Sequence, residues 1–206
     1  MTDDVLELQV DRLVELGVPE LADVGVDAFR AYAEKLEPRD ARAVIAVHPS
    51  LVPASRLAPL LSLEGKPGFV VVDMDDLDSF VPIDQLDDAP LYLLHGLDRG
   101  DDLANWSPEE ALPEIRGRGR RPLTVNEGIS WLLQEPDRLA ANHCFMTIGS
   151  RKPKAKGLDA RTPAIWISGG TGRDGRERKG APKVGWCWAG NRHTWLGFAS
   201  VELDPS

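Results

Sequence analysis

The spacing of apolar residues along the chain is helical at the start and strand-like toward the end. Near the N-terminus, apolar residues recur three and four positions apart in two stretches, which is typical of amphipathic helices. Glycine or proline follows each stretch and favours a helix end there. The pattern predicts a helical N-terminal segment over residues 1–38, whose two apolar stripes are Leu6, Val10, Leu13 and Val14, then Phe29, Tyr32, Ala33 and Leu36.

Two capping boxes predict helices in the middle of the chain. Ser107 with Glu110, and Thr124 with Glu127, have the spacing in which a hydroxyl caps the helix and the glutamate bonds back to the capping residue. We expect Pro113 to cut the first of these helices short, because proline lacks the N–H that a helix interior uses.

Short apolar runs bounded by turn-forming residues predict the strands. The last two runs flank Gly190 and Asn191, and a glycine that leads a two-residue loop suits a type II′ hairpin turn. We therefore expect an α+β fold in a single domain over residues 1–206, with N-terminal helices packed on a mainly antiparallel sheet that ends in a Trp-rich β-hairpin. The runs are 43–47, 69–72 and 91–94, and within a C-terminal β-meander over 143–200 they are 144–148, 164–168, 184–189 and 194–200.

The predicted hairpin would gather aromatic side chains on one face of the sheet. Side chains alternate across a strand, so pairing about this turn places three indoles and one imidazole together, and Cys187 on the other face. Such a row can stack on a sugar ring, a nucleobase or a planar cofactor, and it can equally be core. The row consists of Trp186, Trp188, His193 and Trp195.

Charge is distributed unevenly, and this adds a second candidate for binding. Residues 151–183 carry a net charge of +7, whereas the rest of the chain carries −16. We expect this basic loop to form an electropositive rim near His193 that holds an anion, because guanidinium groups bind phosphate through paired hydrogen bonds. A solvated loop would look the same in sequence. The predicted rim residues are Arg151, Lys152, Arg173, Arg176, Arg178 and Lys179.

Several classes of function are not supported by the sequence. No catalytic motif is complete, and no cofactor is predicted. The soft metal ligands, such as Cys187 and His193, would point to opposite faces, so we expect no metal site and no disulfide. A pI near 5.0 argues against nucleic acid as a partner. No run reaches the length of a membrane span, and the acidic N-terminus is unlike a signal peptide, so we expect a cytoplasmic protein.

One stretch of the sequence is distinctive enough to suggest a family. Residues 185–197, with the pattern GWCWAGNxHTWLG, together with Thr124 and Glu127-Gly128, resemble an uncharacterised actinobacterial family of unknown function. The resemblance implies a bacterial setting and assigns no activity. We therefore expect an accessory protein that binds an anionic ligand or a protein partner without catalysis. The alternatives are an enzyme acting on a phosphorylated small molecule, and a structural subunit of an assembly; the sequence does not indicate an oligomeric state.

Overall fold

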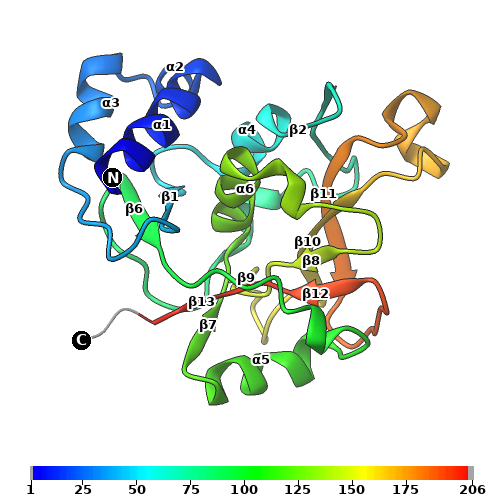
Figure 1. Ribbon diagram of the computed structural model, residues 1–206. Coiled ribbons are helices and arrows are strands. Elements are labelled where there is room, and N and C mark those ends of the chain that lie inside the picture. The colour runs from blue at the N-terminus through cyan, green and yellow to red at the C-terminus, as the bar shows by residue number, and fades with distance from the viewer. Residues whose placement is uncertain (1, 204–206) are drawn as a thin grey trace.

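The computed structural model describes residues 2–203 and has an α+β fold, as the sequence predicts. Three helices begin the chain, α1 (Thr2–Glu15), α2 (Val18–Leu21) and α3 (Val26–Ala33). Leu6, Val10 and Leu13 of the predicted stripe are buried, and so is Phe29 of α3. These helices lie together on one side of the molecule, apart from the main sheet (Figure 1).

The main sheet has five strands in the order β12-β8-β10-β11-β4. The three central strands pair antiparallel, while β12 and β4 join the two edges in parallel. The strands are β4 (Phe69–Val70), β8 (Cys144–Met146), β10 (Arg161–Ile167), β11 (Pro182–Trp188) and β12 (Leu196–Phe198).

Four two-stranded ladders complete the strand pairing, and all four are antiparallel. They join β1 (Val44–Val47) to β6 (Leu91–Leu94), β2 (Ser62–Leu63) to β3 (Lys66–Pro67), β5 (Val81–Pro82) to β9 (Ser150–Arg151), and β7 (Arg120–Pro122) to β13 (Ser200–Glu202).

The central helix of the fold is α6 (Val125–Gln134), which contacts both β1 and β10 (Figure 1). Every residue from 125 to 133 is buried, so this helix is covered on all sides and not on one face alone. Gly128 permits close packing here, because a Cβ at this position would lie 2.6 Å from Thr147 Cγ2. Thr124 and Glu127 form the predicted capping box at its start.

Two further helices, α4 (Ala54–Leu57) and α5 (Pro108–Gly117), lie at opposite ends of the molecule (Figure 1). Ser107 and Glu110 form the second predicted capping box. The prediction that Pro113 ends this helix is wrong, since α5 continues to Gly117. The proline removes one backbone hydrogen bond, and Arg118 bonds back to Glu114 and Ile115 to close the last turn.

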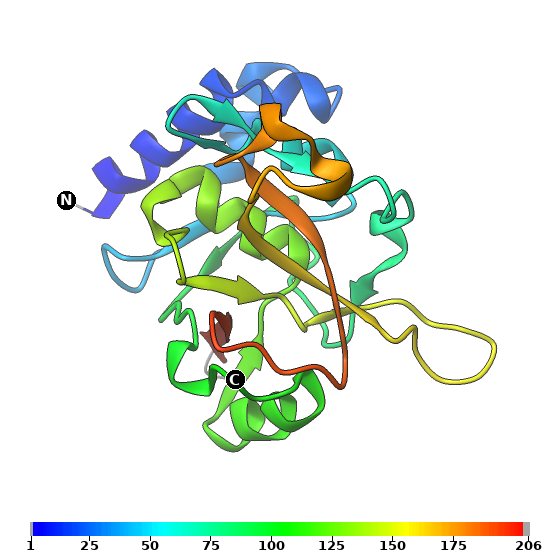
Figure 2. The ribbon, with the colours of Figure 1, turned by 90° about the vertical axis from the view of Figure 1, so that its right-hand side faces the viewer.

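The predicted Trp-rich β-hairpin does not form, because β11 and β12 are separated by β8 and β10. One edge of β11 pairs with β10 over residues 182–188, and the other pairs with β4 at Lys183 and Val184. After a turn in which the Asn191 N–H donates to the Trp188 carbonyl at 3.0 Å, the chain runs beside the segment before α5. Figure 2 shows this red segment, residues 189–195, next to the green α5. The chain then returns to pair with the open edge of β8.

As a result, the four predicted aromatic residues do not share one face. Trp186 and Trp188 are neighbours, with ring centroids 4.5 Å apart, and Trp186 lies opposite Pro163 of β10. Trp195 packs instead on Trp166, at 6.3 Å between centroids, and Trp166 lies opposite Lys183. Because positions 183 and 186 point to opposite sides of a strand, the row is divided between the two faces of the sheet.

Candidate functional site

Two of the six basic residues predicted to form a rim pair with acidic side chains of the protein itself. Lys152 Nζ lies 2.5 Å from Asp76 Oδ2, and Arg173 lies 3.6 Å from Asp73. Arg151 donates to the Asp159 carbonyl at 3.0 Å. Three of the six, Arg173, Arg176 and Lys179, are exposed, and the Arg178 guanidinium lies 4.4 Å from the centroid of the Phe69 ring.

His193 has a different environment from the predicted one. Its ring lies 5.5 Å from that of Trp195, and its carbonyl accepts a hydrogen bond from the Asn105 N–H at 2.8 Å. Burial lowers the pKa of the His193 imidazole. Trp186 is half-buried and packs against the core, whereas Trp188 is 47% exposed. Ligand binding by these aromatic and basic residues stays a prediction.

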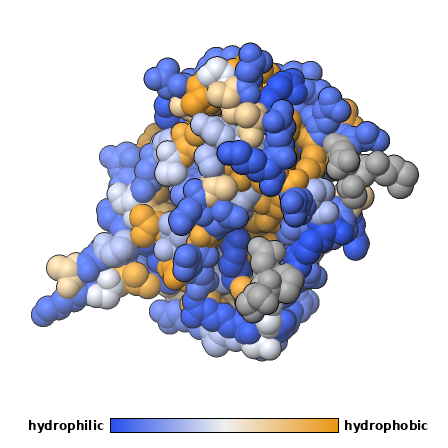
Figure 3. Space-filling model, turned by 90° about the vertical axis from the view of Figure 1, so that its left-hand side faces the viewer, coloured by the Kyte–Doolittle hydropathy of each residue, from blue (hydrophilic) through white to orange (hydrophobic). Residues whose placement is uncertain are grey.

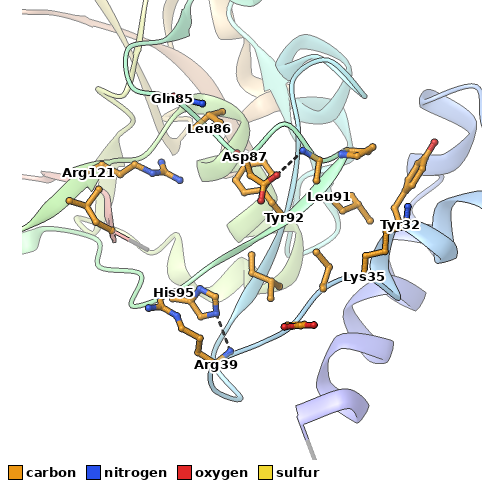
Figure 4. Close-up of a pocket in the computed structure, with 16 residues that line it drawn as sticks. Tyr32, Lys35, Arg39, Gln85, Leu86, Asp87, Leu91, Tyr92, His95 and Arg121 are labelled. Carbon is orange, nitrogen blue, oxygen red and sulfur yellow. Dashed lines mark hydrogen bonds between the residues drawn. The ribbon is translucent and has the colours of Figure 1, made fainter. Parts of the chain in front are cut away.

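A cavity of about 840 Å³ lies elsewhere, among four stretches of the chain (Figure 4). Its volume is within the usual range for small-molecule sites. One wall is α3 with the residues after it, and the other is the connection from β5 to β6; the N-terminal part of β6, Arg121 of β7 and Leu203 complete it. Figure 3 looks onto this side of the molecule, where patches of apolar surface lie among polar residues.

A buried polar network lies at one end of the cavity. The Glu127 carboxylate is fully buried and accepts two hydrogen bonds from Arg121, at 2.6 and 2.9 Å, and one from the Tyr92 hydroxyl at 3.0 Å. It also accepts the Thr124 N–H at 2.7 Å. Burial and the nearby Glu127 charge raise the pKa of Tyr92, which keeps the phenol protonated as a donor. This network fixes Tyr92 and Arg121, which both line the cavity.

The charge of Arg121 is balanced within this network. Burial alone would lower the pKa of its guanidinium, but the hydrogen bonds and the charge of Glu127 raise it overall. Arg121 is therefore a cation in a close, two-bond pair with Glu127.

The other charged residues of the cavity stand on separate walls. Lys35 and Arg39 follow α3, and the Arg39 backbone N–H donates to His95 Nε2 at 3.3 Å, whereas Lys35 lies nearer Tyr32 (Figure 4). Asp87 stands on the opposite wall, where its Oδ1 accepts the Ala89 N–H at 2.8 Å. Glu37 also lines the cavity, on the basic side.

A comparison with protein-family models gives one match, over residues 12–204, to a family of unknown function. The chain belongs to this family, DUF5701. The resemblance drawn from the sequence is therefore confirmed as far as a family of unknown function. No curated protein and no solved structure matches this DUF5701 chain.

Over residues 2–203, no group of three or more His, Cys, Asp or Glu side chains is arranged to hold a metal ion. Within the same range, no helix has the length and apolar character to cross a membrane. Both cysteines are free thiols, on β8 and β11, with β10 between them.

The sequence did not reveal this cavity. Its lining residues come from segments that are far apart in the chain, and Tyr92 meets Glu127 across 35 positions. Glu127 was identified only as a cap, because a capping box is a local pattern whereas its bonds to Arg121 and Tyr92 are tertiary.

Proposed function

We propose that this protein is a non-catalytic binding protein, which holds the anionic group of a ligand or partner in the cavity between α3 and β6. The observation that carries the proposal is that basic residues from two segments, Lys35 and Arg39 after α3 and His95 after β6, line the same cavity. We also propose a bacterial cytoplasmic setting, where free thiols are ordinary.

The chemistry of the two walls supports a ligand with two kinds of polar group. A carboxylate or phosphate would lie against the basic wall, since lysine and arginine both donate charge-assisted hydrogen bonds. Asp87, on the opposite wall, would accept hydrogen bonds from amide or hydroxyl groups of the same ligand. Apolar lining residues, among them Leu36 and Leu86, would cover the part between them.

Titration of the protein with glutamate, succinate and inorganic phosphate tests this proposal. We expect chemical-shift changes in NMR spectra at residues 35–39 and 85–95, and binding that weakens as salt is added. Lys35→Glu should reduce the affinity for the best of these anions by about tenfold or more, because a repulsive charge replaces an attractive one.

Lys156→Glu is the matched control. It makes the same change of charge on the exposed loop after β9, which projects from the molecule in Figure 2 (yellow). Its affinity should equal that of the wild type. If no anion shifts these resonances, or if both variants lose affinity equally, the proposed function is wrong.

A further inference from the structure

A second, smaller cavity lies at the start of α6. Its volume of about 120 Å³ equals about four waters, since each water occupies about 30 Å³ of the liquid. The stretches 49–54, 77–82 and 124–126 border it, together with Ser150 of β9. None of its lining residues lines the cavity between α3 and β6. A ligand held here would therefore be separate from the proposed anion.

Asn126 of α6 supplies an unpaired acceptor at this cavity. The residue is only 4% exposed, and its Nδ2 donates to the carbonyls of Val52 at 2.9 Å and Val47 at 3.4 Å. These two bonds fix the orientation of the side-chain amide. Among residues 2–203, no donor to Asn126 Oδ1 is found. Because a buried oxygen without a donor is costly, Oδ1 favours a donor from outside the chain.

Two buried hydroxyl groups supply donors at the same cavity. Ser150 is 1% exposed, and its Oγ accepts the Val125 N–H at 3.0 Å. Thr124 Oγ1 accepts the Glu127 N–H at 3.2 Å. Each of these bonds uses a lone pair of the hydroxyl oxygen and leaves its proton, for which no acceptor is found within residues 2–203. The buried part of the cavity thus offers one acceptor and two donors.

The rest of the lining is apolar except for one carboxylate. Leu77 and Phe80 are buried there, and three prolines also border the space. Asp78 is exposed at the mouth, where its two oxygens accept the Ser55 N–H at 2.9 Å and the Ser55 hydroxyl at 2.6 Å. No Lys, Arg or His is among the lining residues in the described part of the chain. The charge of Asp78 therefore disfavours an anion, and the buried part has no carboxylate to hold a cation.

We propose that this cavity binds a small uncharged amide, a carboxamide group on a short, branched apolar stem. The amide N–H would donate to Asn126 Oδ1, and the amide oxygen would accept from the Ser150 hydroxyl. These two side chains belong to different elements, α6 and β9, so separate donor and acceptor atoms suit them better than a single oxygen does. The stem would lie against Leu77 and Phe80. Such a site rejects analogues that leave one of its buried polar groups unpaired.

Three molecules with the same skeleton test the polar groups on the wild-type protein. Isobutyramide has a donor and an acceptor, methyl isopropyl ketone lacks the donor, and isobutyrate lacks the donor and carries a negative charge. Each is titrated into isotopically labelled protein, and the N–H resonances of residues 124–126 and of Ser150 are followed by NMR. We expect isobutyramide to bind saturably, and the ketone and isobutyrate to bind about tenfold or more weakly than the amide.

A substitution at the mouth tests whether the amide enters this cavity. Val81 lines the cavity and is exposed, so a larger side chain can cover the mouth without displacing the core. Val81→Trp should weaken the binding of isobutyramide about tenfold or more. Val72→Trp is the matched control, because Val72 is also exposed and does not line the cavity. Its affinity should equal that of the wild type.

Several outcomes would overturn the amide site. They are that isobutyramide shifts none of these resonances, that the ketone or isobutyrate binds as tightly, or that Val81→Trp binds the amide as well as the wild type does. The anions of the proposed function are followed at other residues, 35–39 and 85–95, so the failure of one site leaves the other standing.

Discussion

Glu127 combines two roles in one buried carboxylate, as a helix cap and as the partner of Arg121 and Tyr92. Glu127→Ala would leave the Arg121 guanidinium without its pair and would remove the acceptor for the Thr124 N–H. Removing one partner of a buried ion pair costs about 3–5 kcal/mol. We therefore expect a loss of about this size in the free energy of unfolding, measured with urea.

The second capping box provides the control for this substitution. Glu110 has the same position in its box at the start of α5, but its charged partner is Arg192, and both side chains are largely exposed. Glu110→Ala should reduce stability much less than Glu127→Ala, because water replaces the lost contacts. Equal losses would show that the burial of Glu127 contributes nothing.

Gly128 is a second residue at which packing, and not backbone conformation, requires a small side chain. A Cβ there would come within 3.2 Å of Ile165 Cδ1 and Phe145 Cε2, in addition to Thr147. Gly128→Ala should lower the free energy of unfolding by about 1–3 kcal/mol, since overpacking forces neighbours out of position. At Gly117 in α5, a Cβ would have no neighbouring atom within 4 Å. Gly117→Ala should therefore leave the free energy of unfolding unchanged or raise it slightly. Thermal unfolding of the two variants checks both expectations, and a stable Gly128→Ala would contradict the close contact between α6 and the sheet.

At the scale of elements, the sequence predicts what is determined locally. The helices at Ser107 and Thr124 begin where their capping boxes indicate, because cap and glutamate are three residues apart. The N-terminal helices and most strands also follow from periodicity. Pro113 is an exception: a proline predicts the end of a helix, but the loss of one backbone hydrogen bond does not end α5 there.

Strand partners could not be predicted in this way. A turn forms near the predicted place, but its centre is at Ala189 and Gly190, and Gly190 lacks the positive φ of a type II′ turn. After this turn the chain bonds to a segment that is distant in sequence, since the Asn105 N–H donates to the His193 carbonyl. The same limit applies to the predicted binding residues, because the acidic partners of Lys152 and Arg173 are Asp76 and Asp73, in a turn that is distant in sequence.

The cavity between α3 and β6 depends on several elements at once, so the spacing of residues could not reveal it. Its charged lining residues come from separate segments, among them the residues after α3 and the connection from β5 to β6.

At the scale of the whole molecule, an ion-pair network joins segments that are distant in sequence. Asp76, in the turn after β4, accepts hydrogen bonds from Arg161 of β10 at 2.6 and 3.0 Å and lies 2.5 Å from Lys152. Arg161 also pairs with Asp159 and lies over the Phe80 ring. These contacts hold the turn over residues 73–80 against β10 of the main sheet.

The pH dependence of stability should reveal this network. The hydrogen bonds from Arg161 lower the pKa of Asp76 from 3.8 to about 2. Its contribution is complete above the unfolded value of 3.8 and is lost as the pH falls through the folded value, because the unfolded state binds the proton first. Asp76→Asn should therefore lower the free energy of unfolding by about 1–2 kcal/mol at neutral pH, allowing for partial exposure, and by much less near pH 2. Urea titrations of both proteins over this range measure the difference. Asp75→Asn removes an exposed charge from the same turn and is the control. A difference between Asp76→Asn and wild type that stays constant as the pH falls would exclude an ionic role for Asp76.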